Sequence, residues 1–81
     1  MTPSEADKRI MQSRVVLARY NLMMNAGDHP YGRMDGTVRM LHQEQDELRK
    51  IASEHPMKGP KISRLVSQWS DLITRIRESA G

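Results

Sequence analysis

The clearest hydrophobic pattern lies toward the C-terminus of the chain. Seven apolar residues between positions 62 and 76 recur at spacings of three and four, which brings them within about 120° of one another on a helical wheel. This periodicity predicts an amphipathic helix over 61–79 with a single side directed at the core, and Pro60 suits the start of such a helix. The core-facing residues of this helix are expected to be Ile62, Leu65, Val66, Trp69, Leu72, Ile73 and Ile76.

A second helix is predicted over 37–54. Thr37 is a suitable N-cap residue, a slightly earlier start at Asp35 is the alternative, and the helix is expected to end at Glu54 because His55 precedes Pro56. Its apolar positions are sparser than those of the C-terminal helix, and Gln45 stands where the periodicity calls for an apolar residue. Because the run 42–47 is wholly polar, we expect this helix to be the most exposed of the three.

The first predicted helix spans 3–26 and has an unusual distribution of apolar residues. Thr2 and Glu5 form a capping-box pattern at its start, and Gly27 provides a stop. Its apolar residues lie on three sides of the helix. There is one apolar stripe, a second stripe displaced from it by about 100° on the helical wheel, and a group of further apolar residues on a third side. Two neighbouring helices can cover two stripes but hardly a third. The first stripe consists of Met11, Val15, Ala18, Leu22 and Ala26, the second of Ile10, Leu17 and Met24, and the third side of Val16, Tyr20 and Met23.

Two connections separate these helices. The segment 27–36 is rich in Gly and Asp and also holds Pro30, so we predict a loop, and 55–60 with its two prolines predicts a rigid turn. The expected fold is therefore a single all-α domain over 1–81: a three-helix bundle in which 37–54 and 61–79 form an antiparallel hairpin with the first helix packed along it. A second copy, giving a homodimer, or a partner protein is expected to cover the surplus apolar side of the first helix.

Composition strengthens the expectation of a partner. The chain has 81 residues and no cysteine, which excludes disulfides and thiolate metal sites. A core of this size usually gives a net stability of only ~3–5 kcal/mol, so self-association or a partner is favoured. The first residues have neither the basic start nor the apolar block of a signal peptide, and no apolar run approaches the length of a membrane span. We therefore expect a cytoplasmic protein without a membrane partner.

No chemical motif stands out. His42 and Asp46 have the spacing of two metal ligands on one helical face, but no third ligand is evident and no metal site is predicted. The loop glycines match neither dinucleotide nor phosphate-loop spacing, and no serine occupies a nucleophile elbow. We expect no enzyme activity, no cofactor and no small-molecule substrate.

The favoured function is therefore that of a small regulatory or adaptor protein that acts by protein–protein contact. The first helix and the loop 27–36 are expected to provide the contact, because Tyr, Arg and Met are enriched at interfaces. Such chains are typical of small bacterial or phage accessory proteins. The predicted partner-binding residues are Val16, Tyr20, Met23, Tyr31, Arg33 and Met34.

Two other functions remain open from the sequence. A small nucleic-acid-binding transcriptional regulator would use Lys58, Lys61 and Arg64. The formal net charge of +3 is modest, and a connection of about six residues with two prolines does not fit a helix-turn-helix. The second alternative is a subunit of a larger structural assembly, docked through the first helix.

Overall fold

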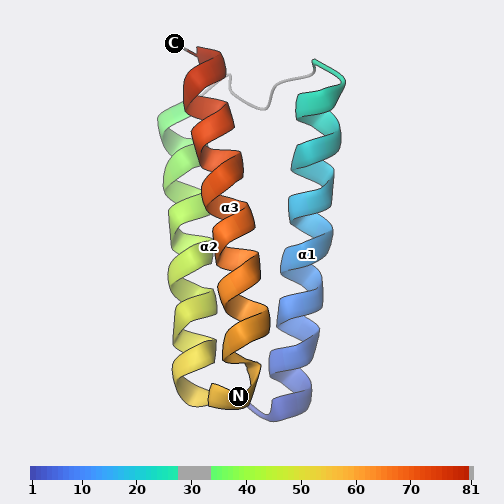
Figure 1. The fold of residues 1–81 in the computed structure, drawn as a ribbon, viewed down its shortest axis with the longest axis vertical. Helices are drawn as coiled ribbons and strands as arrows, with labels where there is room; N and C mark the ends of the chain where they lie inside the picture. Colours follow the sequence, from blue (N-terminus) through green and yellow to red (C-terminus); the bar gives the residue numbers. More distant parts are fainter. Residues whose placement is uncertain (28–33, 81) are drawn as a thin grey trace.

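The computed structural model describes residues 1–27 and 34–80. Within these ranges the chain forms the α-helices α1 (Pro3–Asn25), α2 (Met34–Glu54) and α3 (Gly59–Ala80), with the short 3-10 helix η1 (Pro56–Lys58) between α2 and α3 and no strand. The helices lie side by side along the long axis of the molecule (Figure 1). The predicted all-α class is confirmed.

The start of α1 follows the sequence prediction. The Thr2 hydroxyl accepts a hydrogen bond from the Glu5 backbone N–H at 3.1 Å, and the Glu5 carboxylate accepts one from the Thr2 N–H at 3.2 Å. These hydrogen bonds hold the pKa of Glu5 below its usual value. The helix ends at Asn25, one residue before the predicted end, and Gly27 has the positive φ of +75° that glycine adopts without strain.

The starts of the other two helices differ from the prediction. The loop was expected to extend to residue 36, but α2 already begins at Met34 and includes Gly36 in its first turn. Likewise, α3 begins at Gly59 rather than at residue 61. Glycine in a helix costs only about 1 kcal/mol relative to alanine, so tertiary packing of the helix that follows can outweigh it. Glycine content alone was therefore a poor guide to where these helices begin.

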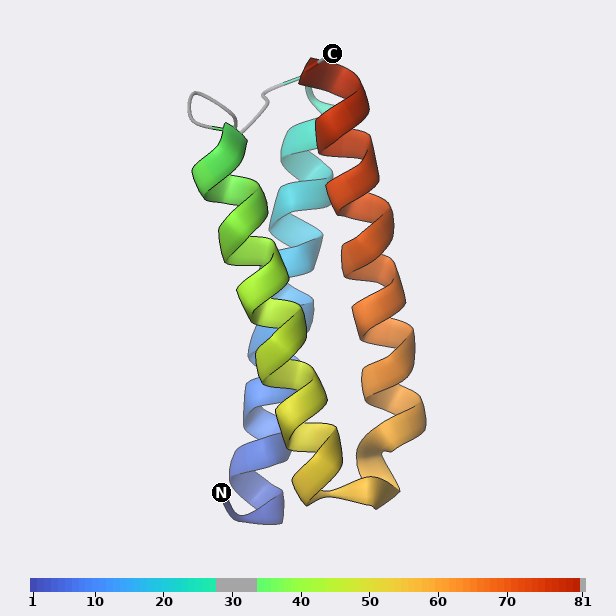
Figure 2. The ribbon, with the colours of Figure 1, turned by 90° about the vertical axis from the view of Figure 1, so that its left-hand side faces the viewer.

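The core lies between α2, α3 and one side of α1. All predicted core positions of α3 are buried except Val66, which is half-buried against the core. The α2–α3 pair has the most extensive contact, and α1, rather than α2, has the least contact with its neighbours. Figures 1 and 2 show η1 and the start of α1 at the same end of the bundle. The buried apolar residues are Ala6, Ile10, Leu17, Met24, Val38, Leu41, Leu48, Ile51, Ile62, Leu65, Trp69, Leu72, Ile73 and Ile76.

The polar run of α2 is better packed than its composition suggests. Gln45 is buried, and its side-chain amide donates to the Val66 carbonyl at 3.0 Å and to the Ser70 hydroxyl at 2.7 Å. Its side-chain oxygen lies 3.2 Å from Nδ1 of His42. A buried amide with all these partners avoids the cost of an unsatisfied polar group. Gln45 therefore fastens α2 to α3 from a position where an apolar residue was expected.

Candidate partner-binding surface

The core-facing side of α1 follows a regular heptad pattern. Its members alternate at spacings of four and three, and all of them are buried except Tyr20, which is half-buried. Ser13 is the polar member of the set, and it interrupts the apolar pattern in the sequence. This inner stripe consists of Ala6, Ile10, Ser13, Leu17, Tyr20 and Met24.

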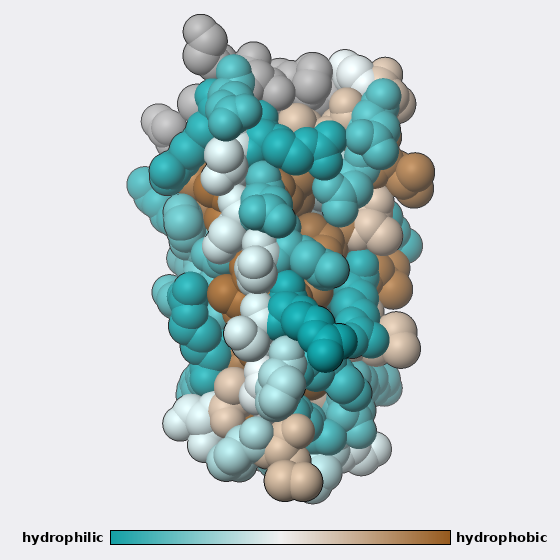
Figure 3. Space-filling view, in the orientation of Figure 1, coloured by the Kyte–Doolittle hydropathy of each residue, from teal (hydrophilic) through white to brown (hydrophobic). Residues whose placement is uncertain are grey.

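A second apolar stripe runs along the opposite side of α1. Met11 is 57% exposed, Val15 45% and Leu22 69%, with the exposed Ala18 between them. At 100° per residue, these positions lie about 150° from the inner stripe. In Figure 3, apolar side chains project at the edge of the molecule formed by α1. Met11, Val15, Ala18 and Leu22 are called the outward stripe below.

A groove between α1 and α2 adjoins the outward stripe. It has a volume of about 630 Å³, and Val15 and Met11 of the stripe also line it. Val16 is 41% exposed and Met40 is 62% exposed on its two walls. The stripe and this α1/α2 groove therefore form one continuous apolar surface.

The predicted partner-binding residues are distributed unevenly over this surface. Val16 and Tyr20 both line the α1/α2 groove, but Tyr20 is half-buried and its ring packs edge-on against Trp69, with centroids 6.1 Å apart. Met23 is also half-buried. Tyr31 and Arg33 lie outside the described residues, as does the side chain of Met34.

The structure also corrects which side of α1 is in surplus. The sequence prediction assigned the surplus to the side with Val16, Tyr20 and Met23, whereas the most exposed large apolar residues of α1 are Met11 and Leu22. The signal that identifies the inner stripe is its heptad spacing, provided that Ser13 is accepted as a core position. The indole N–H of a buried tryptophan needs an acceptor, and Ser13 supplies it.

A polar network beneath the groove ties the three helices together. Trp69 Nε1 donates to the Ser13 hydroxyl at 2.9 Å, and the same hydroxyl helps to lower the pKa of the Glu44 carboxyl. Arg9 donates to both oxygens of that carboxylate, through Nη1 at 2.8 Å and through Nη2. Such two-pronged, charge-assisted pairs are stronger than neutral hydrogen bonds. The network therefore fixes the position of α1 against α2 and α3.

The protonation of Glu44 is linked to this network. Burial by itself raises the pKa of the carboxyl, but the hydrogen bonds from Arg9, the polar Ser13 hydroxyl and the charge of Arg9 outweigh it, so the pKa is lowered overall. A lowered pKa in the folded state means that the ionised carboxylate stabilises the fold. That stabilisation is fully present above the unfolded pKa of about 4.3, and it is lost as the pH falls through the folded value.

We expect Glu44→Gln to destabilise the protein by about 1–3 kcal/mol at pH 7, because a charge-assisted hydrogen-bonded pair is weakened. The difference from wild type should shrink as the pH falls below about 4.3, because the unfolded-state carboxyl is protonated first and the folded-state carboxyl follows at its lower pKa. Urea unfolding at a series of pH values measures both effects. Asp46→Asn is the control, because among the described residues Asp46 forms only an exposed ion pair with Arg49 at 3.2 Å. A destabilisation that stays constant from pH 7 to pH 3 would contradict this account.

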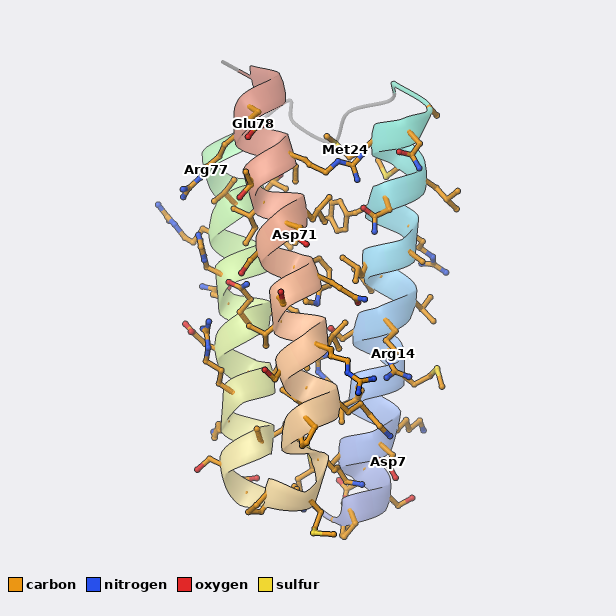
Figure 4. The ribbon with its side chains drawn as sticks, viewed as in Figure 1. Asp7, Arg14, Met24, Asp71, Arg77 and Glu78 are labelled. Atoms are coloured by element: carbon orange, nitrogen blue, oxygen red, sulfur yellow. The ribbon has the colours of Figure 1, made fainter. Side chains whose placement is uncertain are left out.

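A groove between α1 and α3 carries most of the cations near the outward stripe. Its volume is about 640 Å³, and Arg14, Lys61, Arg64 and Arg75 line it together with one acid, Asp71. Figure 4 shows Arg14 on α1 and Asp71 on α3. Cations in such a groove raise the local concentration of anionic groups. This groove is called the basic groove below.

The predicted nucleic-acid-binding residues are divided between two places. Lys61 and Arg64 line the basic groove, whereas Lys58 donates to the Asp7 carboxylate at 2.6 Å, at the end of the bundle that holds η1 and the start of α1. The hydrogen bond from Lys58 holds the pKa of Asp7 below its usual value. The structure therefore brings Lys61 and Arg64 together with Arg14, a residue that the sequence prediction did not include.

Comparisons of the chain with protein-family models, curated proteins and solved structures give no match. Within the described ranges, no helix has the length and apolar character needed to cross a membrane. In the same part of the chain, no group of three or more histidine, aspartate or glutamate residues is arranged to hold a metal ion.

Proposed function

We propose that this chain is a small non-catalytic regulatory or adaptor protein that binds a partner protein through α1. The outward stripe carries this proposal, because it gives α1 a second apolar side at helical spacing, opposite the side that faces the core. Exposed apolar surface that the fold itself does not use is typical of an interaction site. In this proposal the antiparallel hairpin of α2 and α3 is the scaffold, and α1 is the recognition element.

The shape of the surface favours a helix as the bound element. An apolar ridge at spacings of four and three matches the seam at which one helix packs against another. The α1/α2 groove beside the ridge offers Val16 and Met40 to the same partner. Methionine and valine in such a groove give a surface that an amphipathic helix can fill.

Nucleic-acid binding receives less support from the same geometry. Lys58 is engaged with Asp7, and Asp71 lies among the cations of the basic groove. A phosphate backbone is bound by cations and makes no use of an exposed apolar stripe. The outward stripe would then remain without a role.

Because the chain has no cysteine, single-cysteine variants test the proposal directly. In purified protein, Val15→Cys and Lys50→Cys are expected to react rapidly with N-ethylmaleimide, whereas Leu17→Cys is expected to react slowly because Leu17 is buried. In cells that naturally make the protein, Val15→Cys should become several-fold less reactive, because the partner covers the outward stripe. Lys50→Cys lies on an exposed side of α2 and should keep its reactivity.

The comparison between cells and purified protein decides the outcome. If Val15→Cys is as reactive as Lys50→Cys in both settings, nothing covers the outward stripe and the proposal is wrong. If Leu17→Cys is the fast-reacting variant in purified protein, α1 presents its other side and the surface described above does not exist.

A further inference from the structure

We infer that the partner segment bound by α1 is an acidic amphipathic helix, with an apolar seam flanked on both sides by carboxylates. This inference rests on the proposed function and names the chemistry of the partner. It follows from the distribution of cations on the two sides of the outward stripe.

One flank of the outward stripe carries Lys8 and Arg19, which line the α1/α2 groove. The other flank carries Arg14, which lines the basic groove together with Lys61 and Arg64 of α3. None of these five side chains has a hydrogen-bond or ion-pair acceptor among the described residues. In the part of the chain that the structure describes, the apolar seam is therefore bordered along both edges by cations that have no hydrogen-bonded or ion-paired acid.

The acidic residues of α1, Glu5 and Asp7, precede the stripe, and the Asp7 carboxylate, which accepts a hydrogen bond from Lys58, also attracts Lys61. The sequence from Lys8 to Gly27 contains no aspartate or glutamate. The nearest carboxylate on the α2 wall, that of Glu44, is already engaged by Arg9. Acids for Lys8, Arg14 and Arg19 would have to come from the partner.

A second copy of this chain fits the surface poorly. Pairing two α1 helices through their outward stripes would bring Lys8, Arg14 and Arg19 of both copies into one interface without a carboxylate on either stripe. Like charges brought together in this way cost free energy and disfavour the complex. An acidic helix would turn the same cations into attractive contacts, and Arg14 and Arg19 could each hold a carboxylate with two hydrogen bonds.

A lipid surface also fits less well than a helix. The outward stripe spans only about 60° of the helical wheel, whereas helices that lie in a bilayer interface present a broad apolar side. The neighbouring apolar residues Val16 and Met40 line a groove rather than a convex face. A ridge beside a groove is the geometry at which a partner helix packs.

Two matched synthetic peptides test the inference. Each has about four heptads with leucine at the a and d positions, and the e and g positions are all glutamate in one peptide and all lysine in the other, so that neither pairs with itself at neutral pH. We expect purified protein to bind the glutamate peptide at least about 10-fold more tightly by fluorescence anisotropy. The affinity should fall as salt is raised.

Charge-reversal variants make the test specific to the outward stripe. Arg14→Glu combined with Arg19→Glu should abolish or reverse the preference for the glutamate peptide. Lys50→Glu combined with Arg77→Glu changes the net charge equally at exposed positions of α2 and α3 and should preserve it. If both pairs of substitutions weaken binding equally, the attraction is non-specific and the inference is overturned.

Other outcomes also decide against an acidic helix. Equal binding of the two peptides, tighter binding of the lysine peptide or binding of neither overturns it. So does stronger binding of anionic phospholipid vesicles that depends on Arg14 and Arg19, or a dimer in sedimentation that Val15→Glu dissociates. If Val15→Cys is nevertheless protected in cells, and neither vesicle binding nor a dimer is observed, the proposed function stands and only the chemistry of the partner is wrong.

Discussion

Trp69→Ala is expected to unfold most of the protein at 25 °C. Trp69 is fully buried at the centre of the core and is the largest of the fully buried side chains. Truncating a buried tryptophan to alanine costs about 3–5 kcal/mol, which matches the whole net stability expected of a domain this small. The change also removes the donor to Ser13, which lies in the network that joins α1 to the other helices. Loss of helical circular dichroism and of a cooperative urea transition measures the effect.

A conservative double variant serves as the control for this prediction. Trp69→Phe combined with Ser13→Ala removes both partners of the hydrogen bond but keeps an aromatic ring in the core. Removing both partners avoids leaving one of them unsatisfied, so this variant should remain folded with a smaller loss of stability. The account of the core would be contradicted if Trp69→Ala unfolded cooperatively with a free energy of unfolding within about 1 kcal/mol of the wild-type value.

The sequence predicted the fold well where one physical signal dominates. The periodicity of α3 identified its core side, and the capping box located the start of α1, because both patterns are local. The starts of α2 and α3 were placed too late in the sequence, because whether Gly36 and Gly59 join a helix depends on packing that the local sequence does not contain.

The candidate site was only partly predictable. The sequence showed that α1 has more apolar surface than two neighbours can cover, but three apolar stripes could be assigned to the core in more than one way. The assignment depends on Ser13, which is a core position only because Trp69 requires a hydrogen-bond acceptor across the bundle. Contacts between residues so far apart in sequence cannot be inferred from the periodicity of either helix alone.

The cations beside the outward stripe illustrate the same limit. The sequence prediction grouped Lys61 and Arg64 with Lys58 because the three residues are close in sequence. In the structure Lys58 pairs with Asp7, and Arg14 from a different helix joins Lys61 and Arg64 in the basic groove. Proximity in sequence therefore selects a different set of residues from the set that lines the groove, because a groove between two helices takes its members from both.

The second large effect is expected from Val15→Glu combined with Leu22→Glu. Both side chains are exposed, and glutamate is a better helix former than valine, so the isolated protein should keep its helicity and its stability within about 0.5 kcal/mol. Burying two carboxylates in an apolar seam against an acidic partner should nevertheless weaken binding by about 100-fold or more. The control is Ser53→Glu combined with Ser67→Glu, which adds the same charge at exposed positions of α2 and α3.

The central claim, that α1 binds a partner through its outward stripe, is tested most directly by quantitative co-purification from cells that naturally make the protein. Tagged wild type, the Val15→Glu/Leu22→Glu variant and the Ser53→Glu/Ser67→Glu control would be compared at equal expression. We predict at least one protein that wild type and the control retain equally and that the Val15→Glu/Leu22→Glu variant loses. The claim would be contradicted if all three proteins retained the same set of partners, or if wild type retained none.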